Sequence, residues 1–326
     1  MFVLGLQGSP RIKGNTSILL SEFLSEAERI GANTRCIDVS RKEISPCQEC
    51  GNCEKKGYCP IDDDMQQIYP LLRRAEIIVM ATPVFFYGPT AQLKALIDRS
   101  QALWARRYVH KLVDPGRKWR RGLLLSVGAT KGKDLFQGIQ LTAKYFFDAV
   151  GARFEGAQDS LTYRQIEEAR EIEQHPTALP DARQKARVLV PPFVQRKRIL
   201  FLSTADACRG QMASALAQYH RGDRMEVESA GSTPAPKLHP LTEEVMEKKG
   251  IDMAFREPKT IEEATRSGMP ELVISVGNEE AQAPFSNVPK RAWGLPEPCG
   301  QSKESVRKLR DDIERRLGRL SAEMLA

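Results

Sequence analysis

The feature that most constrains the fold of this chain is an opening pattern of strand, loop and helix that occurs twice. Residues 2–24 run from a short apolar segment through a polar, glycine-containing loop into an amphipathic helical pattern, and residues 199–220 repeat that order. Further apolar segments, such as residues 77–81 and 123–127, alternate with helical patterns. Strands that alternate with helices form parallel sheets covered on both faces. We therefore expect α/β folds with parallel sheets.

The length and the prolines predict two domains. A chain of 326 residues exceeds one ordinary domain. The alternation breaks near residues 179–198, where prolines stand among charged side chains. We expect a first domain at residues 1–185, a linker at 186–197, and a second, smaller α/β domain with a parallel sheet at 198–326.

Composition excludes several classes of protein. The hydrophobic share of 41% and the charged share of 28% are typical of a globular chain, not of a disordered or fibrous one. No window of 18 apolar residues predicts a membrane span, and the first residues lack a signal-peptide pattern. We expect a cytoplasmic protein without a membrane partner.

The net charge of +7 is unevenly distributed. Residues 1–200 hold 31 Lys and Arg against 22 Asp and Glu, and many of the cations lie between Arg106 and Arg121. Such an excess attracts nucleic acid, an anionic nucleotide or an acidic protein. For this cluster alone we favour an ordinary solvated surface, and we expect no nucleic-acid partner.

The loop at residues 8–17 predicts an anion site. It follows a buried strand and opens a helix, so its backbone N–H groups are unpaired and point outward. Arg11 adds a bidentate phosphate donor. Taken alone, the loop indicates phosphate affinity, and an ordinary helix cap at Thr16 remains an alternative.

Three segments together resemble a known family. The string Gly-Ser-Pro-Arg-x-x-Gly-Asn-Thr at residues 8–16 resembles the flavin phosphate loop of the NADPH-dependent FMN reductase superfamily, which has a flavodoxin-like fold. Residues 82–88 resemble its second loop, which lines the isoalloxazine ring, and residues 126–129 resemble its third. The resemblance implies a doubly wound parallel sheet, FMN as cofactor and NAD(P)H as a candidate substrate. The flavin-binding residues that it implies are Ser9, Arg11, Gly14, Asn15, Thr16, Ser17, Pro83, Val84, Phe85, Phe86, Tyr87, Gly88, Ser126 and Gly128.

Four of the seven cysteines form one compact run: Cys47, Cys50, Cys53 and Cys59. In a cytosolic chain such clustering favours metal or redox chemistry over disulfides. Two short C-x2-C steps with a fourth cysteine nearby favour one [4Fe–4S] cluster. Zinc prefers ligand pairs separated by a longer arm, so zinc or structural cysteines are the less favoured alternatives.

Inside a flavodoxin-like domain, this run resembles that of the iron–sulfur flavoproteins, over residues 1 to about 185. The resemblance implies that these four cysteines hold a [4Fe–4S] cluster beside FMN, in a homodimer or homotetramer. It implies a flavin-dependent oxidoreductase that passes electrons between a two-electron donor such as NAD(P)H and one-electron carriers such as ferredoxin. The basic segment at residues 106–121 is then the expected docking site for such an acidic carrier or for a nucleotide phosphate.

The second opening resembles that of low-molecular-weight protein tyrosine phosphatases and their arsenate reductase relatives, over residues 198–326. That family uses Cys-x5-Arg, but here Ser203 stands six residues before Arg209. A serine hydroxyl is far less acidic than a thiol and needs an adjacent base, which the motif lacks. Asp206 replaces the usual asparagine and is expected to place negative charge where an oxyanion would bind, while Glu297 replaces the expected acid.

We therefore expect a catalytically degenerate phosphatase-like domain without phosphatase activity. Cys208 at the predicted helix start is either a reactive thiol or, as we favour, a buried structural cysteine. Two alternatives remain for the whole chain. One is a redox or oxyanion sensor or scaffold that uses the degenerate domain; the other is residual phosphatase or arsenate reductase activity through Cys208 or Glu297.

Overall fold

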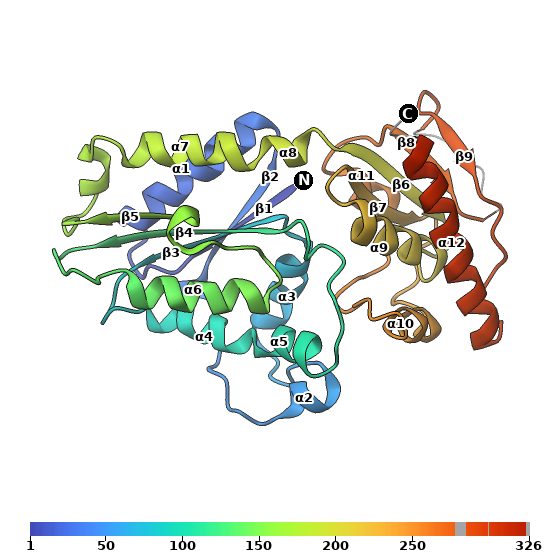
Figure 1. The fold of residues 1–326 in the computed structure, drawn as a ribbon, viewed down its shortest axis with the longest axis horizontal. Coiled ribbons are helices and arrows are strands. Elements are labelled where there is room, and N and C mark those ends of the chain that lie inside the picture. The colour runs from blue at the N-terminus through green and yellow to red at the C-terminus, as the bar shows by residue number, and fades with distance from the viewer. Residues whose placement is uncertain (278–284, 299, 324–326) are drawn as a thin grey trace. The chain divides into compact units, whose positions relative to one another are not determined.

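The computed structural model describes residues 1–277, 285–298 and 300–323. Its internal contacts divide the chain into two units, which Figure 1 shows as two sheets with their helices. The first unit consists of residues 1–111 and 117–194, and the second of residues 112–116 and 195–326.

The first unit is built on a five-stranded parallel sheet of order β2-β1-β3-β4-β5. This is the flavodoxin-like order, and it confirms the predicted doubly wound fold. Strand β1 is buried throughout, and β3 and β4 are buried except at Pro83 and Arg121, because helices cover both faces. The strands are β1 (Phe2–Gln7), β2 (Asn33–Asp38), β3 (Ile77–Pro83), β4 (Arg121–Gly128) and β5 (Ser160–Arg164).

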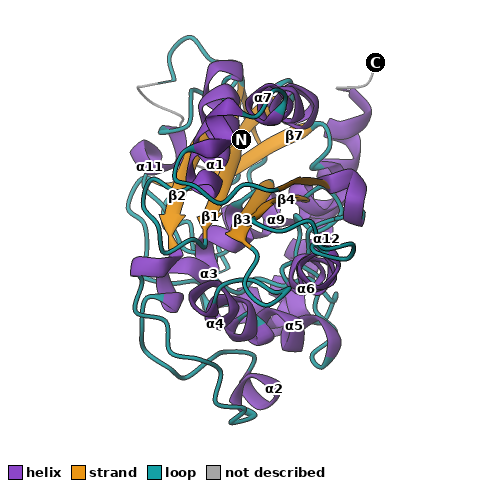
Figure 2. Ribbon diagram, turned by 90° about the vertical axis from the view of Figure 1, so that its left-hand side faces the viewer, coloured by secondary structure: helices purple, strands orange, loops and turns teal. Residues whose placement is uncertain are grey.

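Helices lie on both faces of this sheet, with α1 and α7 on one side and α3 to α6 on the other (Figures 1 and 2). Alternate strand residues such as Val3, Val79 and Leu125 form one core with Phe23 of α1 and Ala182 of α7. The helices are α1 (Asn15–Ile30), α2 (Asn52–Lys56), α3 (Met65–Arg74), α4 (Ala91–Arg99), α5 (Gln101–Tyr108), α6 (Gln137–Ala149), α7 (Ala178–Leu189) and α8 (Pro191–Val194), with short 3-10 turns η1 (Val39–Arg41), η2 (Gly156–Asp159) and η3 (Glu171–Gln174).

Two elements differ from the sequence patterns. The helical pattern of residues 92–103 is two helices, α4 and α5, which meet at Ser100; its hydroxyl donates back to the carbonyl of Leu96 at 3.0 Å. Strand β5 is at the edge of the sheet, and only Tyr163 of its five residues is buried, so it shows no apolar run.

The expected linker at 186–197 contains the end of α7, all of α8 and the first residue of β6.

The second unit has a four-stranded parallel sheet of order β7-β6-β8-β9, which confirms a second, smaller α/β fold. Phe201 and Ile274 from the central strands share a core with Leu216 of α9, Val245 of α10 and Ile313 of α12. The elements are β6 (Lys197–Ser203), α9 (Arg209–Arg221), β7 (Met225–Gly231), α10 (Pro240–Glu247), α11 (Ile261–Thr265), β8 (Leu272–Ser275), β9 (Lys290–Ala292) and α12 (Lys303–Glu323). Among the described residues, no helix combines the length and the apolarity needed to cross a bilayer.

Candidate functional site

The three loops that resemble flavin-binding segments meet at the carboxyl edge of the first sheet. They follow β1, β3 and β4, which are neighbours in a parallel sheet, and ligands of open α/β sheets bind at this edge. Hydrogen bonds join the loops: the Gly8 amide donates to Ala81 O at 2.8 Å, and the Val84 amide to Val127 O at 3.0 Å. The Ser126 hydroxyl donates to Thr82 O at 2.8 Å. The sequence prediction that these loops form one site is therefore consistent with their geometry.

Thr90, which the sequence patterns did not single out, ties two of these loops together. It is fully buried, and its hydroxyl donates to the Gly8 carbonyl at 2.5 Å. The same oxygen accepts from the Leu93 amide and so caps α4. A threonine directly before a helical pattern is a cap signal that sequence can show. Its bond to a loop 82 residues away is visible only in the structure.

The first loop has the chemistry of a phosphate site. The N-cap of α1 is Gly14, which has no side chain to accept from the first amides of the helix. The first turn of α1 holds no acidic residue. The first amides of the helix are therefore left for an anion, as in other phosphate sites. Ser9 and Thr16 are buried, Ser17 is half-buried and Arg11 is exposed. These donors fit the phosphate of FMN.

Asn15 has a different set of contacts. Its side-chain nitrogen donates to Glu168 O at 2.8 Å, and its side-chain oxygen accepts from the Ile172 amide at 3.2 Å. Arg11 also reaches this segment, at Glu167 O and 3.2 Å. Asn15 thus anchors residues 168–172 over the start of α1, and a direct contact with flavin stays a prediction.

The second loop displays aromatic rings on a strained turn. Phe85 and Gly88 exchange two backbone hydrogen bonds of 2.9 Å. The two residues between them, Phe86 and Tyr87, have φ values of 49° and 62°. Bulky side chains rarely adopt this left-handed region, and such strain is concentrated at functional sites. Phe86 is fully exposed, so no packing within the unit explains its conformation.

The strained turn is supported from α6. A Cβ on Gly138 would stand 2.5 Å from the Tyr87 carbonyl oxygen, so only glycine permits this approach. Pro83 and Val84 are half-buried at the base of the turn, and Gly128 is buried at the end of β4. Exposed rings beside a loop of free amides fit the flat ring system and the phosphate of FMN.

The four cysteines lie together beside α4, α5 and α6. All of them line one hollow of about 1030 Å³. Cys47 and Cys50 are exposed, and Cys53 and Cys59 are half-buried. Burial raises the pKa of the Cys53 thiol, and the nearby Cys47 and Cys59 add to that rise. Four cysteines in one loop supply the ligand type that an iron–sulfur cluster takes, and their binding of a cluster stays a prediction. Within residues 1–277, 285–298 and 300–323, no three Cys, His, Asp or Glu side chains are arranged for a single metal ion.

The basic segment at residues 106–121 is partly internal. Arg120 is buried and donates to the carbonyls of Ala75 and Val150 at 2.7 and 2.9 Å. Arg106 is also buried and lies over the ring of Tyr58 at 4.8 Å. These two cations support the fold, so the docking surface expected from the sequence is smaller than the charge count suggested.

The phosphatase-like loop of the second unit joins β6 to α9. The buried Ser203 hydroxyl accepts from the Asp206 amide at 3.1 Å. The Asp206 carboxylate accepts from the Gln211 side chain at 2.9 Å and from the Lys259 amide at 3.1 Å. Burial raises the pKa of Asp206 to about 6. The carboxylate expected at the oxyanion position is thus engaged by Gln211 and Lys259.

The other residues of this loop also have protein partners. Arg209 donates to Leu295 O at 2.9 Å and forms an ion pair of 2.7 Å with Glu297. Cys208 is buried, and burial raises the pKa of its thiol to about 11. A thiol with a raised pKa is a poor nucleophile at neutral pH, as expected of a structural cysteine.

Comparisons with known proteins assign a family to each part. The sequence model of NADPH-dependent FMN reductase matches residues 1–153, and that of low molecular weight phosphotyrosine protein phosphatase matches residues 198–326. An iron-sulfur flavoprotein of Methanocaldococcus jannaschii is 43% identical over 103 residues, or 32% of this chain and 53% of that protein. The chain spans about half the length of this relative and of a similar one from Archaeoglobus fulgidus.

The second part has its own relatives. A Halobacterium salinarum protein whose name contains the words arsenate reductase is 32% identical over 122 residues, or 36% of this chain and 85% of that protein. A solved structure of an arsenate reductase in its phosphate-binding state is 27% identical, covers 39% of this chain and 98% of its own, and has a TM-score of 0.35. The chain thus joins a domain of the NADPH-dependent FMN reductase family to one of the low molecular weight phosphotyrosine protein phosphatase family.

Proposed function

We propose that this protein is a flavin-dependent oxidoreductase that uses FMN and a [4Fe–4S] cluster. Electrons would pass between a two-electron donor such as NAD(P)H and one-electron carriers such as ferredoxin. The observation that carries the proposal is the strained turn at Phe86 and Tyr87, which displays its rings where the three loops of an FMN reductase-family domain meet. The iron-sulfur flavoprotein relatives support the cluster.

Each part of the site has a distinct task in this proposal. The amides at the start of α1, with Arg11 and Ser17, would hold the flavin phosphate. The rings of Phe86 and Tyr87 would pack against the isoalloxazine, and Thr90 fixes the spacing between these two contacts. Bound FMN exchanges one or two electrons, and a cluster exchanges one at a time; the protein binds and orients both. The cluster ligands would be Cys47, Cys50, Cys53 and Cys59.

Partners follow from the same proposal. The protein would form a homodimer or homotetramer, and an acidic electron carrier would dock on the exposed cations of the basic segment. Because Arg106 and Arg120 are buried, Lys111 and Lys118 are the exposed candidates for that contact. Docking through such charges weakens as salt concentration rises.

The test is a cofactor assay on protein purified without oxygen. The expected result is FMN together with about four iron and four sulfide per chain. Cys53→Ser should lose iron and sulfide but keep FMN. Cys36→Ser changes an exposed cysteine outside the run and is the matched control. FMN accompanied by zinc, without sulfide, would refute the cluster. Absorbance titrations with NADPH, NADH and reduced ferredoxin then identify the electron donor.

A second function is proposed for the phosphatase-like domain. Arg209 stands at the start of α9 and forms an ion pair with Glu297. A phosphate or arsenate could compete with Glu297 for this guanidinium. We propose an oxyanion sensor or scaffold in place of a phosphatase. Measurable phosphate binding by calorimetry without hydrolysis of an aryl phosphate is the expected result. Hydrolysis that disappears in Arg209→Ala would contradict it.

A further inference from the structure

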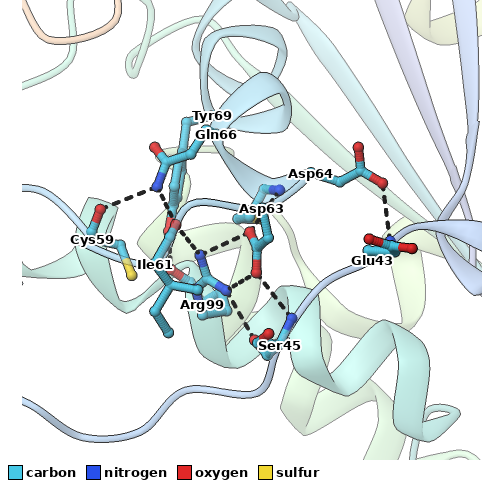
Figure 3. Close-up of polar contacts among 10 residues, drawn as sticks. Glu43, Ser45, Cys59, Ile61, Asp63, Asp64, Gln66, Tyr69 and Arg99 are labelled. Carbon is cyan, nitrogen blue, oxygen red and sulfur yellow. Dashed lines mark hydrogen bonds and ion pairs between the residues drawn. The ribbon is translucent and has the colours of Figure 1, made fainter.

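The two ends of the cysteine loop meet at one buried guanidinium (Figure 3). Arg99 is the last residue of α4 and is 1% exposed. It donates to Ser45 O at 2.9 Å and to Ile61 O at 3.3 Å. Ser45 lies just before the first cysteine of the run and Ile61 just after the last. One side chain therefore contacts both ends of the loop.

Asp63 completes this contact. Its carboxylate binds Arg99 through both oxygens, at 2.6 and 3.1 Å, and also accepts from the Ser45 amide at 3.0 Å. Gln66 adds donations to Cys59 O at 3.1 Å and to Ile61 O at 2.6 Å. A bidentate Arg–carboxylate pair has a fixed geometry, so it holds the loop ends in one position.

The same helix also contacts the flavin loops. Thr90, the N-cap of α4, is bonded to Gly8 of the phosphate loop, and Arg99 is at the other end. At the rise of an α-helix, the nine residues of α4 span about 13 Å. A single rigid element thus links the flavin loops to the base of the cysteine loop.

One hydrogen-bond donor of Arg99 remains. Its Nε is buried and has no hydrogen-bond partner among the residues that the structure describes. Arg99 lines the same hollow as the four cysteines. Buried donors are nearly always satisfied, so an unpaired one beside a ligand site indicates an acceptor that arrives with the ligand. A cluster with anionic sulfurs is such an acceptor.

We propose that Arg99 and Asp63 form a clamp that orders the cysteine loop before the cluster binds and fixes the cluster relative to the flavin loops. The inference rests on the proposed function and makes Arg99 a positioning residue. Arg99 holds the loop ends, and its buried, unpaired Nε–H would donate to a cluster sulfur once the cluster is bound. Hydrogen bonds to cluster sulfurs and neighbouring cations raise the reduction potential.

The experiment compares full-length Arg99→Lys and Asp63→Asn with wild type. Lys keeps the charge but cannot reproduce the planar fork, and Asn keeps the size but not the charge. Lys94→Gln is the matched control, because Lys94 lies on the same helix, lines the same hollow and pairs only with the exposed Asp98 among the described ion pairs. Hydrogen exchange of amides 47–59 in metal-free protein, iron release to a chelator, cluster potential and FMN affinity are measured.

The two clamp variants should exchange amides 47–59 and release iron about 10- to 100-fold faster than wild type. Arg99→Lys should also shift the cluster to a more negative potential, while FMN affinity stays unchanged. Lys94→Gln should exchange these amides and release iron at the wild-type rate. Unchanged exchange and iron release in both variants would overturn the clamp, as would a parallel loss of FMN affinity, which indicates general unfolding. Wild type that takes up no iron and sulfide refutes the proposed function and the cluster role, while exchange still decides whether the clamp orders the loop.

Discussion

Phe86 offers a test in which stability and binding change in opposite directions. Its backbone lies in the left-handed region at φ 49°, and its ring is fully exposed. An L-residue pays about 1–2 kcal/mol for this conformation. Glycine avoids that cost but loses about 0.5–1 kcal/mol through its greater freedom in the unfolded chain. Phe86→Gly should therefore raise the free energy of unfolding of the first unit by about 0.5–1 kcal/mol.

Phe86→Ala separates the ring from the backbone. Alanine removes the ring but keeps the strained φ, so stability should stay within about 0.5 kcal/mol of wild type. Both variants lose the proposed aromatic contact with the flavin, which is worth about 0.5–1.5 kcal/mol. FMN should therefore bind about two- to tenfold more weakly to each.

Calorimetry and flavin fluorescence measure these two effects. The transition of the first unit is identified by its upward shift with added FMN. For a unit of this size, Phe86→Gly should raise its midpoint by about 1–4 °C. A lower midpoint for Phe86→Gly than for Phe86→Ala would refute the strain. Unchanged FMN affinity in both variants would refute the role of the ring.

Three further substitutions test other parts of the structure. Asp206 has a folded-state pKa of about 6, above its unfolded value, so the second unit should lose about 2 kcal/mol of stability as the pH rises from 4 to 6. Urea unfolding of Asp206→Asn should show no such loss and greater stability than wild type at pH 7. Thr90→Val removes the bond to Gly8 and the cap of α4, so it should cost about 1–2 kcal/mol and weaken FMN binding in a fluorescence titration. Glu297→Gln removes the ion-pair partner of Arg209 and should strengthen phosphate binding up to about fivefold by calorimetry; weaker binding would exclude competition between Glu297 and the anion.

The sequence predicted the sheets because their central strands are buried on both faces and read as continuous apolar runs, as in residues 77–81. Strand β5 was missed because an edge strand with one buried residue has no such run. The break at Ser100 was missed because both halves of the pattern favour helix, and the hydroxyl of Ser100 interrupts them through a local bond.

The residues that organise the site were harder to find than those expected to touch the cofactors. Motif spacing located the loops, but Thr90 and Arg99 act through partners 82 and 36 residues away, and no local pattern records such pairings. The partners of Asp206 were not visible in the sequence either. Its left-handed backbone at φ 48° accompanies a carboxylate bound by Gln211 and Lys259, and its predicted place at the oxyanion position stays a prediction.

The phosphatase-like loop keeps its backbone hydrogen bonds although one side chain of the family motif differs. Backbone bonds fix its shape: the amides of Ser232 and Thr233 donate to the carbonyls of Ser203 and Thr204 at 3.0 and 2.9 Å. These two bonds do not use the side chain at position 203, and the Ser203 hydroxyl adds one more by accepting from the Asp206 amide at 3.1 Å. A serine in place of the cysteine of a Cys-x5-Arg loop removes the thiol that serves as the nucleophile. Sequence resemblance over residues 198–326 therefore supports the fold, while the predicted loss of phosphatase activity rests on the side chain at position 203.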